Sequence, residues 1–151
     1  MKLAILGATG RTGRCIAKQA LGLGHDVKVL VRNADKLEDL RSAVEVCAGD
    51  ATNAADVDRL VAGCDAVIVA IGHDSRSSGD MQTVATCNVL SAMKQHGVAR
   101  LISLTGAGVI DANDRPSLVG KLFGVALRLL AKKVHDDAVQ HAEAIRRSDR
   151  E

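Results

Sequence analysis

Three glycines, Gly7, Gly10 and Gly13, stand in the run Gly-Ala-Thr-Gly-Arg-Thr-Gly, directly after an apolar segment that ends at Leu6. Glycines at this spacing let the chain turn sharply, bring its backbone close to a phosphate and pack the next helix tightly on a strand. The first N–H groups of that helix have no partner within the helix, so they and the helix dipole form an anion site. A plain turn between a strand and a helix would also use glycine.

The elements on either side of the glycines separate these two interpretations. A buried strand is predicted over Leu3 to Leu6, and an amphipathic helix over about Thr12 to Leu23, with an apolar face made by Ile16, Ala17, Ala20 and Leu21. This order of strand, glycine turn and helix strongly favours a dinucleotide site. No Lys-Ser or Lys-Thr follows Gly13, so the motif is not a P-loop, which excludes kinases and nucleoside triphosphatases of that type.

The end of the second predicted strand, Val27 to Val31, bears on the choice of cofactor. A site for NAD usually has Asp or Glu about 20 residues past the glycine loop, where the carboxylate binds the ribose 2′-OH. Here that place holds Arg32 and Asn33. A guanidinium pairs with a 2′-phosphate, which a carboxylate would repel. Although an arginine at a strand end is common on protein surfaces, the sequence favours NADP(H) over NAD(H).

Two more strand ends complete the predicted cofactor site. Asp50 follows a short predicted strand, Val44 to Cys47, and could accept a hydrogen bond from an adenine amino group, cap the next helix, or do both. Gly72 follows the apolar run Ala66 to Ile71 and would let the backbone approach the ribose and diphosphate. The predicted cofactor contacts are Gly7, Ala8, Thr9, Gly10, Arg11, Thr12, Gly13, Arg32, Asp50, Ala51, Ala70, Ile71, Gly72 and Thr105.

Catalytic residues are harder to find, because the 151 residues include one Phe and neither Tyr nor Trp. A tyrosine acid is therefore excluded. His73 is an alternative acid, although a loop histidine is more often solvated, and Thr105 is an alternative substrate contact, although a hydroxyl there could simply bond to backbone. Hydride transfer to a flavin needs proximity and orientation more than a protein acid, so a small conjugated acceptor is favoured over a carbonyl.

The elements that must position these residues alternate regularly along the chain. Further helices are predicted over about 34–42, 57–61, 81–95, 117–133 and 136–147, with His135, Asp136 and Asp137 at the start of the last one, and a fifth strand over 101–104. The unbroken apolar run 66–71 is typical of a central parallel strand buried on both faces. The sequence therefore predicts one α/β domain over residues 1–151, a Rossmann-like doubly wound parallel sheet of about five strands with helices on both faces.

The composition bears on which partners the protein could bind and on the cellular compartment in which it is expected. Lys and Arg number 20 against 18 Asp and Glu, and the net charge of +2 does not indicate a nucleic-acid surface. No apolar run approaches the roughly 20 residues of a membrane span, and the N-terminal one is too short for a signal peptide. The 4 cysteines lack metal-ligand spacing, which favours reduced thiols, no metal site and a cytoplasmic protein. The apolar face over 118–130 is expected to pack on the sheet, with a homodimer or lid surface as the alternative and a membrane-surface helix less favoured.

Longer motifs carry a resemblance to a known family. They are Gly-Ala-Thr-Gly-Arg-Thr-Gly at 7–13, Val-Leu-Val-Arg at 29–32, Gly-Asp at 49–50, Ala-Ala-Asp-Val-Asp at 54–58, Asp-Ala-Val-Ile-Val at 65–69 and Ala-Met-Lys-Gln-His-Gly-Val at 92–98. With these motifs the chain resembles the atypical short-chain dehydrogenases/reductases, and within them the NAD(P)H-binding, NmrA-like branch that includes flavin reductases of the biliverdin reductase B type. The resemblance implies NADP over the first and fourth strands, in either a flavin-type reductase or a non-catalytic NADP-binding regulator.

The sequence departs from that family in two respects. Classical members of the superfamily use a Tyr with a nearby Lys, and their Ser or Thr after the fifth strand aligns here with Gly106, which leaves Thr105 as the neighbouring hydroxyl. Similar proteins have a helix whose last residues correspond to Glu143 to Ser148 here. After that helix they continue into a sixth strand and into segments that close over the substrate. The chain is therefore expected to lack those closing segments, and the identity of the acceptor stays open.

Overall fold

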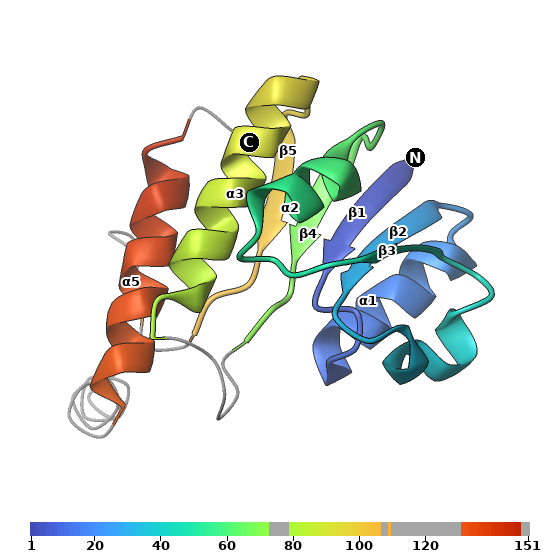
Figure 1. Cartoon of the computed structure of the whole chain (residues 1–151), viewed down its shortest axis with the longest axis horizontal. Coiled ribbons are helices and arrows are strands. Elements are labelled where there is room, and N and C mark those ends of the chain that lie inside the picture. The colour runs from blue at the N-terminus through green and yellow to red at the C-terminus, as the bar shows by residue number, and fades with distance from the viewer. Residues whose placement is uncertain (73–78, 107–108, 110–130, 149–151) are drawn as a thin grey trace.

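The central sheet has five parallel strands in the order β3-β2-β1-β4-β5 (Figure 1). The computed structural model describes residues 1–72, 79–106, 109 and 131–148. The strands are β1 (Lys2–Leu6), β2 (Asp26–Val31), β3 (Glu45–Ala48), β4 (Ala66–Val69) and β5 (Arg100–Ser103). Because β2 and β3 lie on one side of β1 while β4 and β5 lie on the other, the strand order reverses between β1 and β4. The predicted doubly wound α/β fold is confirmed.

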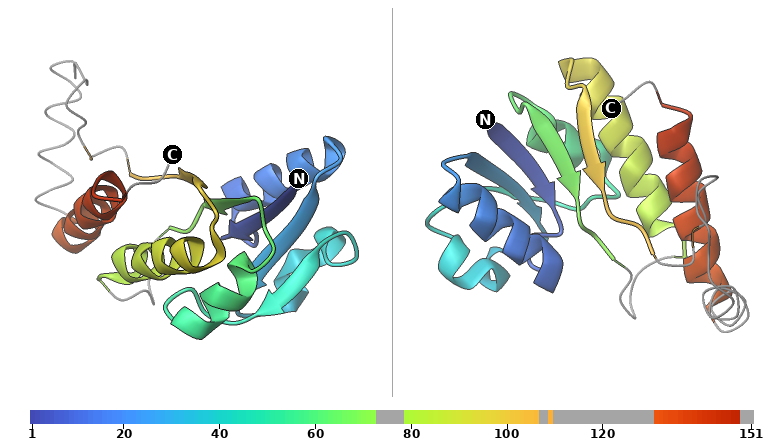
Figure 2. Two further views of the ribbon diagram at one scale, coloured as in Figure 1. Left: turned by 90° about the horizontal axis from the view of Figure 1, so that it is seen from above. Right: turned by 180° about the vertical axis from the view of Figure 1, so that it is seen from behind.

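Helices cover both faces of this sheet, as Figure 2 shows. The helices are α1 (Arg11–Gly22), the 3-10 helix η1 (Ala34–Leu40), α2 (Ala54–Val61), α3 (Met81–His96) and α5 (Lys132–Arg146). Apolar side chains of α1 and η1 pack with one face of β1, β2 and β4, and those of α2 and α3 pack with the other face. Helix α5 lies against α3. Among the described residues, no helix is both long and apolar enough to cross a membrane.

The core explains why the strand at 66–71 has no polar residue. All four residues of β4 are buried, and alternate residues belong to the two opposite core clusters. A strand with helices on both sides has no solvent-facing side, so every position favours an apolar residue. The regular strand ends at Val69, two residues earlier than predicted, and residues 70–72 continue past the edge of the sheet.

Three predicted helix boundaries are wrong. Helix α2 begins at Ala54, three residues before the predicted start at Val57. The segment predicted as a helix over 34–42 is the shorter η1, in which the Asn33 side chain accepts a hydrogen bond of 2.9 Å from the Asp35 N–H. The last helix begins at Lys132, so His135, Asp136 and Asp137 do not start it. Asp137 instead lies against the beginning of α3. The predicted helix over 117–133 and the apolar face at 118–130 fall largely outside the described residues.

Glycines allow α1 to begin in backbone contact with the turn that follows β1. Gly7 has φ of +90°, a conformation that side chains disfavour. A Cβ added to Gly7 would lie less than 3.0 Å from the backbone of Ala70, and one added to Gly13 would lie less than 3.0 Å from the backbone of Gly7. Neither obstacle is a flexible side chain. The glycine spacing therefore sets the distance between α1 and the strands β1 and β4.

Gly13→Ala tests this constraint. The added methyl group must push the start of α1 away from the turn, so we expect a loss of about 1–3 kcal/mol in the free energy of unfolding measured in urea. Gly22→Ala is the matched control, because no described atom lies within 4 Å of a Cβ at that place in the same helix. It should be neutral or stabilise by up to about 1 kcal/mol. Equal effects of the two substitutions would contradict the close approach.

Candidate functional site

A cleft of about 510 Å³ opens at the carboxyl ends of the strands, where the strand order reverses. Ligands of open α/β sheets bind at such a reversal, and the volume lies within the range of small-molecule sites. Nine of the predicted cofactor contacts line the cleft: Gly7, Thr9, Gly10, Arg32, Asp50, Ala51, Ala70, Ile71 and Gly72. The fold thus brings together residues from the ends of β1, β2, β3 and β4.

The other predicted contacts do not line the cleft. The Ala8 side chain is buried in the core on the α1 side, and Gly13 packs against Gly7. Arg11 and Thr12 are exposed in the first turn of α1, and Thr105 is exposed beyond β5. His73 lies outside the described residues. Contact with a cofactor stays a prediction for these residues and for the nine that line the cleft.

The start of α1 is open to an anion. Within the described residues, no side chain caps this helix at Gly10, and its first turn holds no acidic residue. By contrast, Asn53 accepts hydrogen bonds from the first N–H groups of α2, and Asp137 accepts them from the first N–H groups of α3. Since Gly10 lines the cleft, the unsatisfied N–H groups and positive dipole end of α1 are available to a diphosphate.

Two basic residues, Arg32 after β2 and Lys36 in η1, line the same cleft. Arg14 of α1 fixes the position of η1, since its Nη2 donates to the Lys36 carbonyl at 2.6 Å and its Nη1 donates to a Glu38 carboxylate oxygen at 2.7 Å. Lys36 was missed by the sequence prediction. No spacing rule links it to Arg32, because Arg32 precedes η1 and is not part of that helix.

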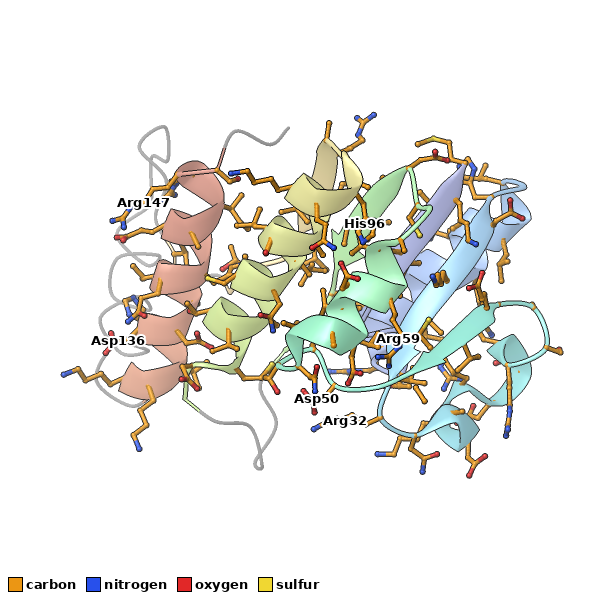
Figure 3. The ribbon with its side chains drawn as sticks, turned by 45° about the horizontal axis from the view of Figure 1, so that its top comes forward. Arg32, Asp50, Arg59, His96, Asp136 and Arg147 are labelled. Atoms are coloured by element: carbon orange, nitrogen blue, oxygen red, sulfur yellow. The ribbon has the colours of Figure 1, made fainter. Side chains whose placement is uncertain are left out.

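Asp50 lies close to Arg32 at this end of the cleft, as Figure 3 shows. Its Oδ1 accepts hydrogen bonds from the Thr52 backbone N–H at 2.8 Å and the Thr52 hydroxyl at 2.7 Å. These two bonds, and to a smaller extent the charge of Arg32, lower the pKa of Asp50, so its carboxylate stays ionised at neutral pH. The helix-capping alternative for Asp50 is wrong, because Asn53 caps α2.

Two amides from α3 hold the backbone walls of the cleft. Asn88 Nδ2 donates to the Ala51 carbonyl at 3.0 Å, and Gln82 Nε2 donates to the Ile71 carbonyl at 2.9 Å. Ala51 and Ile71 both line the cleft, on the β3 side and on the β4 side respectively. Sequence reasoning missed both amides, because neither pair lies at a helical or strand spacing.

Comparisons of the sequence with known proteins also indicate a dinucleotide-binding domain. The model of a family described as NAD(P)H-binding matches residues 7–149. The uncharacterized protein YwnB of Bacillus subtilis is 32% identical over 114 residues, which cover 76% of this chain and 51% of YwnB. The chain therefore spans about half the length of this curated relative.

Solved structures with the same fold extend the comparison. A short-chain dehydrogenase/reductase from Veillonella parvula in complex with NADP has a TM-score of 0.78 at 17% identity, over 99% of this chain and 65% of that one. ChuY, an anaerobilin reductase from Escherichia coli O157:H7, has a TM-score of 0.77 at 20% identity, over 99% of this chain and 69% of that one. Such identities show the fold alone. The family match over residues 7–149, together with the cleft at the glycine loop, shows that this chain belongs to the NAD(P)H-binding family.

Proposed function

We propose that the chain binds NADP(H) in the cleft and acts as an NADPH-dependent reductase of a flavin or a similar small conjugated acceptor. The observation that carries the cofactor choice is the pair of basic residues, Arg32 and Lys36, at the end of the cleft next to β2. A 2′-phosphate at this place would meet two cations, while the diphosphate would meet the uncapped start of α1. The NADP bound to the Veillonella parvula relative supports the choice.

The cleft fits the dinucleotide in three physical respects. Gly7 and Gly10 line the cleft without side chains, the start of α1 lacks a carboxylate within the described residues, and Thr52 holds the Asp50 carboxylate in place. When bound, the nicotinamide would supply a hydride, and the protein would orient it against the acceptor. Because the chain has no tyrosine, water would supply the proton to an exposed acceptor atom.

The reductase proposal also draws on the similarity of the sequence motifs to NmrA-like flavin reductases and on the reductase activity in the name of ChuY. His73 and Thr105 remain the proposed contacts of the acceptor. Thr105 follows β5, next to the strand β4 whose end forms one wall of the cleft. That neighbouring position would place its hydroxyl on the nicotinamide side.

A non-catalytic NADP-binding regulator is the second candidate function. In the described part of the chain, the cleft on the β4 side is lined by Ala70, Ile71, Gly72 and Met81. None of these side chains donates a proton. Cleft-lining side chains of this kind, as far as the described residues go, suit occupancy sensing as well as hydride transfer to a flavin.

Arg32→Glu tests the cofactor choice. The substitution removes a charge-assisted hydrogen bond to the 2′-phosphate and puts a carboxylate where the guanidinium was. Calorimetry should therefore show NADPH binding weakened by about 10- to 100-fold and NADH binding almost unchanged. Lys36→Glu should act in the same direction. Lys94→Glu on the last turn of α3 is the control charge reversal and should change neither affinity. Equal losses of NADPH and NADH affinity in Arg32→Glu would refute the 2′-phosphate role.

A turnover assay separates the two candidate functions. The protein is mixed with NADPH and either flavin mononucleotide or riboflavin, and the loss of the reduced-nicotinamide absorbance is compared with a protein-free control. If the protein is a reductase, we expect steady NADPH oxidation at a rate above that of the control. Arg32→Glu should slow this oxidation at low NADPH concentration. NADPH binding without oxidation by either flavin would contradict the flavin reductase and favour the regulator.

A further inference from the structure

A buried carboxylate from α5 caps the first turn of α3. Asp137 is 2% exposed, and its two carboxylate oxygens accept hydrogen bonds from the Gln82 N–H at 2.8 Å and the Thr83 N–H at 2.9 Å. The residue before the helix, Asp80, makes no side-chain cap within the described residues. The cap of α3 therefore comes from another helix, 55 residues further along the chain. The two N–H donors at the positive end of the helix dipole satisfy the two buried carboxyl oxygens.

Gln82 connects this cap to the cleft. Gln82 is 6% exposed. Its backbone N–H donates to Asp137, and its side-chain amide donates to the Ile71 carbonyl at 2.9 Å. Because β4 ends at Val69, Ile71 lies beyond the regular ladder of the sheet. The bond from Gln82 therefore gives the Ile71 carbonyl a fixed partner where the regular strand pairing no longer supplies one.

A second pair of contacts keeps α5 in place one turn after Asp137. His141 is 1% exposed, and its Nδ1 lies 2.6 Å from the Thr86 hydroxyl of α3, while its Nε2 lies 3.2 Å from the Ser103 hydroxyl of β5. Burial lowers the pKa of His141, so the ring is neutral and has one donor and one acceptor nitrogen for the two hydroxyls. Helix α5 is thus joined by polar contacts to α3 and to the edge of the sheet.

Ile71 and Gly72 lie on the opposite side of the cleft from Arg32. If the 2′-phosphate lies at the end of β2 and the diphosphate at the start of α1, the remaining half of the dinucleotide must extend over the end of β4. We infer that Asp137 and Gln82 are positioning residues, which hold the Ile71–Gly72 backbone in the place that receives the nicotinamide half. This inference rests on the proposed NADP(H) binding and assigns a role to residues outside the glycine loop.

The experiment compares a whole dinucleotide with its adenosine half. Affinities for NADPH and for 2′,5′-ADP are measured by calorimetry on the full chain, for Gln82→Met and for Asp137→Asn. Gln82→Met keeps the backbone N–H and much of the side-chain shape but removes the donor to Ile71. It should weaken NADPH by about two- to tenfold, as expected for one hydrogen bond, and leave 2′,5′-ADP within about twofold of the unchanged protein.

Asp137→Asn should give the same selective loss, because the amide removes the charge and one of the two acceptor oxygens at the start of α3. The matched control for Asp137→Asn is Asp136→Asn, at the neighbouring and more exposed carboxylate. The matched control for Gln82→Met is Gln95→Met, at an exposed position of α3. Both controls should bind the two ligands as the unchanged protein does.

Two results would overturn the positioning role: unchanged NADPH affinity in both Gln82→Met and Asp137→Asn, or an equal loss of NADPH and 2′,5′-ADP, which would indicate general damage to the fold. A different failure concerns the proposed function. If the unchanged protein binds neither ligand, the cleft is not an NADP(H) site, and the positioning role falls with it.

Discussion

The contact between two stretches of backbone, at Gly7 and Gly13, is the constraint on which the rest of the site depends. It lets α1 start directly over the reversal point of the sheet, with the carbonyl of Ala70 against Gly7 on the other side. Any side chain at either glycine would separate the helix from the strands. The open N–H groups of α1, the cleft and its two walls all follow from this close approach.

The walls of the cleft depend on a second, polar set of contacts. Helix α3 supplies Asn88 to the Ala51 carbonyl and Gln82 to the Ile71 carbonyl, and it is itself capped by Asp137 of α5. Apolar packing holds α3 against the sheet, but it does not fix the direction of a carbonyl group. Directional hydrogen bonds do, and they make both α3, whose apolar face belongs to the core, and α5 part of the site.

Local patterns were sufficient to predict most of the fold. The glycine run, the apolar run at 66–71 and the alternation of strands and helices each lie within one or two neighbouring elements, and their physical meaning does not depend on the rest of the chain. Nine cofactor contacts predicted in this way line the cleft. The prediction failed at the short helix η1, which Arg14 of α1 holds in position, and at the start of α5, where Asp137 caps α3 instead of its own helix.

The missed site residues have a common physical cause. Asp137 was predicted to mark the start of its own helix, because a polar cluster before an apolar pattern usually does. It caps a different helix instead, and only the packing of α5 on α3 creates that pairing. Gln82 and Asn88 likewise bond to carbonyls whose positions depend on the whole sheet. Sequence spacing records neighbours within an element, and it does not record which two elements will meet.

Nuclear magnetic resonance of the backbone amides locates the bound dinucleotide on the chain without relying on turnover. The protein is titrated with NADP and the amide shifts are followed residue by residue. We expect the largest changes at residues 7–13, at Arg32 and at residues 70–72, with the amides of the first turn of α1 shifting most. Saturable NADP binding that leaves the amides of residues 7–13 unchanged would contradict the proposed cofactor site.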